Sequence, residues 1–78
     1  MPKQDLFDFS HALYLIRRDK KVARRGWNGK DMWLAIQYPD SFSKMTLPYV
    51  YMRTAMGDFV PWLCSQGDLL SQDWYEVE

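Results

Sequence analysis

The chain has 78 residues, of which 47% are hydrophobic and 17% aromatic, and its ten basic and ten acidic residues give a formal net charge of zero. A chain of this length forms one domain and buries only about 60–65% of the surface that its unfolded form exposes, so oligomerisation is a natural further source of stability. Zero net charge disfavours a general nucleic-acid or membrane binder. One cysteine and one histidine exclude an intramolecular disulfide and are too few for a typical zinc site. Without a long apolar run or the apolar middle of a signal peptide, the chain is expected to be soluble and cytoplasmic.

An amphipathic helix is predicted near the N-terminus, over about residues 8–19. Its apolar positions follow the spacing i, i+3, i+4, i+7 and are Phe9, Ala12, Leu13 and Ile16. Asp8 or Ser10 is the expected N-cap. The residues that suit the negative C-terminal end of this helix are Arg17, Arg18 and Lys20. His11 lies off the apolar stripe, so we expect it to be exposed and without a chemical role.

A β-hairpin is predicted next. Residues 21–24 alternate polar and apolar side chains, and residues 32–38 read as the returning strand. Between them lies Asn28-Gly29, the strongest two-residue turn signal, because both residue types tolerate positive φ. The pattern therefore predicts a tight turn with Trp27 at its shoulder.

The middle of the chain predicts a loop and two further strands. Residues 39–47 are loop by composition. Residues 49–54 are rich in strand formers, and a turn at 56–58 leads into a strand at 59–62. Pro61 removes a backbone donor, so this last strand is expected to be short or to lie at an edge.

The C-terminal part predicts a short helix and a final strand. Residues 65–68 have the form of a helix capping box, with Asp where Glu is more usual. The helix is expected to end by about residue 72, with Leu69 and Leu70 facing the sheet. Residues 74–77 alternate as a strand does. The predicted fold class is therefore α+β: a small antiparallel sheet of about five strands with an N-terminal helix and a short late helix.

Catalytic machinery is sparse in this sequence. His11 lies far along the chain from Cys64 and Ser65, which argues against a nucleophile–histidine dyad. Asp68 and Asp73 are the carboxylates available for acid–base work, although Asp68 has a plainer use as a helix cap. There is no glycine-rich phosphate loop. We therefore expect neither catalysis nor a bound metal or cofactor.

Residue types suited to nucleotide recognition recur beside the tryptophans. Aromatic faces stack on bases, each contact contributing about 1–3 kcal/mol. Amides and carboxylates can contact base edges or ribose hydroxyls, and basic side chains can hold phosphates. The groups concerned are Trp27-Asn28, Trp62 with Ser65-Gln66, and Asp73-Trp74. Two alternatives stay open: the tryptophans can form core or interface, and Asn28 can serve only its turn.

Three stretches, in this order and spacing, resemble the phage Thoeris anti-defence 2 family. They are the helix pattern over 9–16, KVARRGWNGKDMWL at 21–34 and PYVYMRTAMGDFVPWLCSQGDLLSQDW at 48–74. The motifs GWNGK and VPWLxSQxDLLxxDW are specific when they occur together. The resemblance covers residues 8–78, so we expect residues 1–78 to form a single domain of this type.

The resemblance implies a sponge rather than an enzyme. Members of the family bind and sequester, without cleaving it, a glycocyclic ADP-ribose signal that TIR-domain proteins make from NAD on phage infection. Some relatives also hold cyclic dinucleotides at separate sites. Members assemble as homotetramers with pockets where subunits meet, and they act in the cytoplasm of the infected host.

Site residues also follow from the resemblance, position by position. Trp27 and Asn28 are expected to stack on the base and contact its edge. The residues expected to contact ribose and phosphate are Trp62, Ser65, Gln66 and Asp68, followed by Asp73 and Trp74. The expected phosphate partners are Arg24 and Lys30. Structural alternatives stand beside these roles, because Trp62 and Trp74 can belong to the core and Ser65 and Asp68 can simply cap a helix.

Two other functions remain open at the level of sequence. In the first, the tryptophans form contacts between the subunits of an oligomer, and the domain binds a protein. In the second, Asp68 and Asp73 make the chain a small hydrolase of nucleotide signals. Analysis of what the protein does to a bound signal separates both from the sponge.

Overall fold

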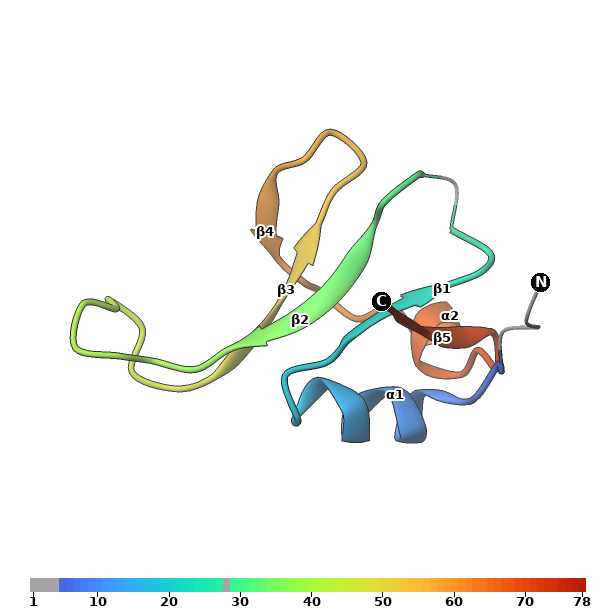
Figure 1. Cartoon of the computed structure of the whole chain (residues 1–78), viewed down its shortest axis with the longest axis horizontal. Coiled ribbons are helices and arrows are strands. Elements are labelled where there is room, and N and C mark those ends of the chain that lie inside the picture. The colour runs from blue at the N-terminus through green and yellow to red at the C-terminus, as the bar shows by residue number, and fades with distance from the viewer. Residues whose placement is uncertain (1–4, 28) are drawn as a thin grey trace.

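The computed structural model describes residues 5–27 and 29–78 and has two layers, a five-stranded antiparallel sheet and a helix packed on one of its faces (Figure 1). The elements in chain order are α1 (Phe9–Ile16), β1 (Lys21–Arg24), β2 (Trp33–Gln37), β3 (Tyr49–Arg53), β4 (Phe59–Pro61), α2 (Gln66–Leu69) and β5 (Trp74–Val77). The strand order is β4-β3-β2-β1-β5. The predicted α+β class is confirmed. Within the described part of the chain, neither helix has the length and apolar character that a membrane span requires.

Helix α1 begins where the sequence predicted and ends earlier. The Asp8 carboxylate accepts the His11 amide at 3.0 Å and caps the first turn. The last regular residue is Ile16, because Asp19 adopts a left-handed φ of 63° and the Lys20 amide donates back to the Leu15 carbonyl at 3.0 Å. This is a Schellman-type ending, in which an aspartate takes the place usually given to glycine. The predicted end at residue 19 is therefore wrong, and the basic residues expected in the last turn follow the helix instead.

Strand pairing divides the sheet residues between two faces. Val22 pairs with Leu34, and Leu34 with Met52, so these side chains share the face that α1 covers. The fully buried residues of the core are Ala12, Ile16, Val22, Leu34 and Trp74. The opposite face, which we call the open face, carries Lys21, Trp33, Tyr51, Phe59 and Tyr75. Neither helix packs on the open face, so its aromatic and basic side chains are available for binding.

The connection between β1 and β2 differs from the prediction. The two strands pair antiparallel as expected, but residues 25–32 separate them, so the tight two-residue turn is wrong. We call this segment the β1–β2 loop; its Asn28 lies outside the described residues. Gly29 owes its place to close packing: an added Cβ would lie 2.8 Å from the Cβ of Ala55 and would also collide with the sulfur of Met32.

The region around α2 confirms some expectations and corrects others. Pro61 lies in the edge strand β4, and the Ser65 hydroxyl caps α2 by accepting the Asp68 amide at 3.1 Å. The helix ends at Leu69 rather than near residue 72. Leu69 and Leu70 are 40% and 73% exposed, so the prediction that they face the sheet is wrong. A helix of a single turn is too short to lay an apolar face on the sheet.

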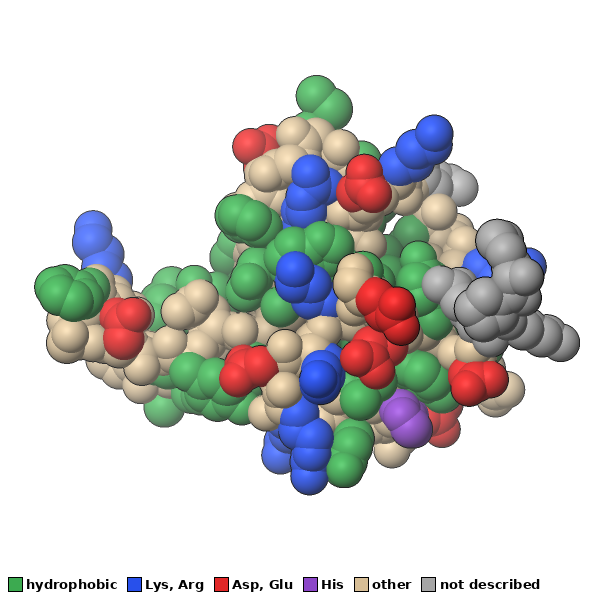
Figure 2. Space-filling model, viewed as in Figure 1, with side chains coloured by type: hydrophobic (Ala, Val, Ile, Leu, Met, Phe, Trp, Pro, Cys, Tyr) green, Lys and Arg blue, Asp and Glu red, His purple; other side chains and the backbone are tan. Residues whose placement is uncertain are grey.

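The loop between β2 and β3 projects from the body of the domain as an arm, at the left of Figure 1. The Tyr38 hydroxyl donates to the Arg17 carbonyl at 2.9 Å and ties the base of this arm to the end of α1. Figure 2 shows hydrophobic side chains on this arm, and the exposed large hydrophobic residues within the loop include Phe42, Met45 and Leu47. The loop predicted over residues 39–47 is thus confirmed.

Replacing Gly29 by alanine is expected to lower the free energy of unfolding by about 1–3 kcal/mol, since the methyl group overpacks the contact with Ala55. Gly67→Ala is the matched control. Its Cβ would meet nothing closer than the Ser65 hydroxyl oxygen at 3.8 Å, so it should stabilise by about 0.4–1 kcal/mol. Urea unfolding of both variants measures the difference, and equal effects would contradict the close packing of Gly29.

Candidate functional site

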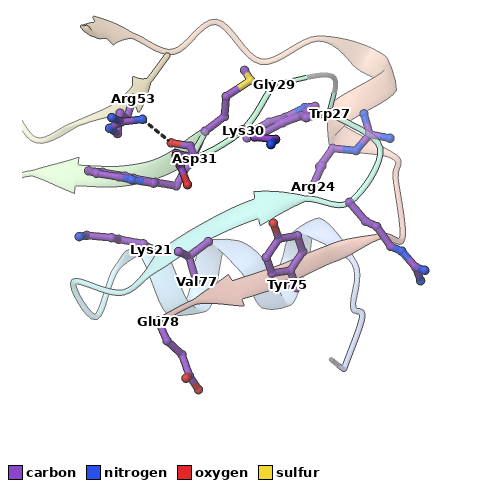
Figure 3. A pocket seen from close by; sticks show the side chains of 13 residues that line it. Lys21, Arg24, Trp27, Gly29, Lys30, Asp31, Arg53, Tyr75, Val77 and Glu78 are labelled. Carbon is purple, nitrogen blue, oxygen red and sulfur yellow. Dashed lines mark hydrogen bonds between the residues drawn. The ribbon is translucent and has the colours of Figure 1, made fainter. Parts of the chain in front are cut away.

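A pocket of about 600 Å³ lies on the open face, beside the β1–β2 loop (Figure 3). Strands β1, β2, β3 and β5 all contribute side chains to it, and the loop and Glu78 supply the rest. The lining residues that concern its chemistry are Lys21, Arg24, Arg25, Lys30 and Arg53, which are basic, and Trp27, Trp33 and Tyr75, which are aromatic. The alternation of side chains along each strand brings residues from distant parts of the sequence to this one face.

The pocket is strongly basic in a chain whose net charge is zero. Its five lysines and arginines outnumber the two acidic lining residues, Asp31 and Glu78. The Lys21 ammonium lies 4.5 Å from the centre of the Trp33 ring, a cation–π contact. Positive charge beside flat rings suits a ligand that combines anionic groups with a planar base.

One of the basic lining residues, Arg24, is already engaged by two carboxylates. Its Nε and Nη2 donate to the two oxygens of Asp73 at 2.8 and 3.3 Å, a bidentate pair. Its Nη1 donates to Oδ1 of Asp68 at 2.8 Å. The guanidinium side chain is only 21% exposed. Arg24 therefore carries little uncompensated charge toward the pocket, which weighs against the expectation that it is a phosphate partner.

The same acidic residues hold the β1–β2 loop. The Gly26 amide donates to Oδ2 of Asp73 at 2.9 Å. The indole N–H of Trp27 donates to Oδ1 of Asp68 at 3.1 Å, and the ring edge packs on Trp74 with centroids 5.4 Å apart. Trp27 is half-buried and lines the pocket from this fixed position.

Arg53 holds the other end of the loop. Its Nη1 donates to the Asp31 carbonyl at 2.8 Å, the bond drawn as a dashed line in Figure 3. Asp31 has a left-handed φ of 61°. The loop is thus held near both of its ends, by Asp68 and Asp73 on the side of β1 and by Arg53 of β3 on the side of β2.

Both carboxylates have lowered pKa values. For Asp68, burial is the largest single influence and favours the neutral acid, but the hydrogen bonds from Arg24, Trp27 and Ser65 and the charge of Arg24 together outweigh it and lower the pKa. For Asp73, the hydrogen bonds from Arg24 lower the pKa first, and the Gly26 amide adds to the effect. Hydrogen bonds to Asp73 and then Asp68 raise the pKa of the Arg24 guanidinium. All three groups therefore stay charged at neutral pH.

The structure separates the predicted site residues into groups. Three of them, Arg24, Trp27 and Lys30, line the pocket, and Asp68 and Asp73 lie behind it. The residues away from the pocket are Ser65 and Gln66, exposed at the start of α2, and Trp62 and Trp74, on the α1 side of the sheet.

The tryptophans on the α1 side of the sheet have core positions. Trp74 is completely buried and its indole N–H donates to the Asp68 carbonyl at 3.0 Å, so the core alternative holds for this residue rather than the predicted ligand contact. Trp62 is half-buried, with its ring 6.1 Å from that of Trp74 and 5.7 Å from that of Phe9.

Sequence reasoning missed five of the basic and aromatic residues that line the pocket, namely Lys21, Arg25, Trp33, Arg53 and Tyr75. A usable signal existed for Trp33 and Tyr75, because each neighbours a residue of the apolar face in a predicted strand and so must point to the other face. Arg53 had the same signal, because it neighbours Met52 of the apolar face. Its place beside Trp33 depends on the register of β2 with β3.

Comparison with known proteins agrees with the motifs in the sequence. The family model described as Thoeris anti-defense 2-like domain matches residues 7–77. Thoeris anti-defense 2 of Bacillus phage SP01 is similar, with 29% identity over 79 residues, and the alignment covers 85% of this chain and 89% of that relative. The family resemblance predicted from the three stretches is thereby confirmed.

Acid should weaken the fold through Asp68 and Asp73. Because their folded-state pKa values lie below the ordinary aspartate value of about 4, the stability they contribute is complete above that value and is lost as the pH falls through the folded values. We expect the free energy of unfolding to drop as the pH falls below about 4, and Asp73→Asn to show a shallower drop. Urea unfolding across this range measures both slopes; identical slopes would contradict the role of Asp73.

Proposed function

This chain belongs to the Thoeris anti-defense 2-like family, and we propose that it counters Thoeris defence by binding a nucleotide signal and holding it uncleaved. Family membership by itself supports an anti-Thoeris function in phage. The finer part of the proposal is that the ligand is glycocyclic ADP-ribose, that it binds in the basic pocket of the open face, and that this takes place in the cytoplasm of the infected host.

The observation that carries this proposal is the meeting of cations and flat rings in one pocket. Lys30 and Arg25 are exposed there, and Trp27 lines the same pocket. Phosphates are held by such cations through charge-assisted hydrogen bonds, and an indole face accepts a base. A sponge must also bind tightly, since about 1 nM affinity corresponds to roughly −12 kcal/mol. A wall fixed before binding lowers the entropic cost of reaching such an affinity.

Holding is favoured over cleavage by the state of the two aspartates. A hydrolase would need Asp68 or Asp73 as a general acid or base, with a pKa near the working pH. Their pKa values are shifted the other way, and both carboxylates are bound to Arg24.

Assembly into a homotetramer is part of the proposal. The open face carries an aromatic cluster in which the rings of Trp33, Tyr51 and Phe59 lie 5.5–6.0 Å apart, and Phe59 is 64% exposed. A second hollow of about 360 Å³ adjoins Tyr51 and Phe59. Such exposed aromatic area on a small domain is suited to contact with another subunit.

The decisive experiment follows the fate of the signal. The protein is incubated with glycocyclic ADP-ribose, freed of unbound ligand and heat-denatured, and the released material is analysed; cyclic dinucleotides are tested in parallel. We expect intact glycocyclic ADP-ribose to be released. A cleaved product would establish the hydrolase instead, and no depletion of any signal would leave a protein-interaction domain.

The pocket is tested by Lys30→Ala, with Lys44→Ala as the matched control. Both lysines are exposed, but Lys44 belongs to the β2–β3 arm and does not line the pocket. Loss of one charged hydrogen bond, about 1.5–3 kcal/mol, should weaken binding of glycocyclic ADP-ribose by about tenfold or more in Lys30→Ala alone. Calorimetry measures this, and equal affinity of the two variants would move the binding site away from the pocket.

A further inference from the structure

We propose that Asp73 is a positioning residue for ligand binding: it lies behind the pocket and sets the affinity by fixing the β1–β2 loop that forms the pocket wall. The inference rests on the proposed function, because it concerns the same pocket. Asp73 is not among the residues that line the pocket, and its carboxylate faces Arg24 and the loop backbone.

Within the described part of the chain, the side-chain bonds of Asp73 end on Arg24 and Gly26, where the chain leaves β1 and enters the pocket wall. Oδ1 accepts from Nε of Arg24, and Oδ2 accepts from the Gly26 amide at 2.9 Å and from Nη2 of Arg24. The Arg25 amide also donates to the Asp73 carbonyl at 3.0 Å. One residue just before β5 therefore fixes the path of the chain as it leaves β1.

The attachment at Asp73 reaches the aromatic wall of the pocket through Trp27. Trp27 follows Gly26 directly, and its amide donates to the Arg24 carbonyl at 3.2 Å. Its ring position depends on Asp68, whose Oδ1 accepts from both Trp27 and Arg24. When Arg24 and Gly26 lose Asp73, the backbone that leads into Trp27 is freed. Arg24, which shares Oδ1 of Asp68 with the indole N–H, then holds that carboxylate less firmly, so the indole is less well fixed.

The other side of the β1–β2 loop is held independently of Asp73. Arg53 holds the Asp31 carbonyl, and Gly29 packs against Ala55. Release at Asp73 thus loosens the part of the wall that carries Trp27 without detaching the whole loop. Ordering that part again on binding costs affinity, which is the usual penalty for a site that is not preorganised.

Charge alone predicts the opposite sign. Removing a carboxylate near a basic pocket makes the surroundings more positive, which by Coulomb attraction favours an anionic ligand. A loss of ligand affinity on neutralising Asp73 therefore shows that this residue positions the pocket wall. A gain or no change shows that Asp73 acts on the ligand only through its charge.

The test compares three variants. Each replaces an aspartate by asparagine and so removes one negative charge. Asp73→Asn offers one acceptor oxygen where two are used, so a bond to Arg24 or Gly26 is lost. Asp68→Asn keeps an oxygen where Oδ1 accepts both bonds, so it should change affinity less. Asp19→Asn is the control, since Asp19 is exposed after α1 and asparagine tolerates its left-handed φ.

Calorimetry with glycocyclic ADP-ribose, and separately with ADP as a simpler anionic probe, should show binding weakened about tenfold in Asp73→Asn, by the ordering cost of one side chain and its loop. Asp19→Asn should match the unmodified protein. Thermal unfolding confirms that each variant is folded at the titration temperature. Equal or tighter binding by Asp73→Asn would overturn the inference.

A readout without ligand separates this inference from the proposed function. Hydrogen exchange of the Gly26 amide and the NMR signal of the Trp27 indole proton are compared in the three variants. Faster Gly26 exchange and a broadened indole signal are expected only in Asp73→Asn. If glycocyclic ADP-ribose does not bind but ADP does, the proposed function fails while the ADP series still decides the role of Asp73. Unchanged exchange at Gly26 would overturn that role.

Discussion

The structure depends on the guanidinium of Arg24 between the carboxylates of Asp68 and Asp73. These three side chains join β1, α2 and the entry to β5 at the point where the β1–β2 loop leaves the sheet. A half-buried charge pair of this kind adds less to stability than its geometry suggests, because desolvation opposes the Coulomb gain. Removing Arg24 is costly, since both carboxylates then keep their charge without this partner. The cluster therefore fixes how β1, α2 and the entry to β5 meet.

The two faces of the sheet have different physical roles. One face packs its apolar side chains on α1 and around the fully buried Trp74, which supplies most of the hydrophobic stabilisation. The open face carries lysine, arginine and aromatic side chains that a monomer leaves in contact with solvent. The chain belongs to an anti-defence family, and both the proposed ligand contact and the proposed subunit contact lie on this open face.

Residues of the same type have different roles according to their partners. Arg24, Arg25 and Arg53 all line the pocket, yet Arg24 is neutralised by two carboxylates and Arg53 holds a loop carbonyl. Lys30 projects from the loop and is exposed. The tryptophans divide in the same way, because Trp74 is core while Trp27 lines the pocket. Composition predicts that such residues bind something, but not which of them is free to do so.

The sequence alone determined the elements and their class. Hydrophobic periodicity located α1 and the strands, Asp8 and Ser65 marked the helix starts, and Pro61 marked the edge strand, because these signals act between near neighbours in the chain. The end of α1 and the length of the β1–β2 connection were mispredicted, since backbone bonds at Lys20 and packing at Gly29 override local propensity. Only the tertiary structure decided the site, because strand register and contacts across more than 40 residues, such as those of Arg24 with Asp68 and Asp73, determine which side chains meet.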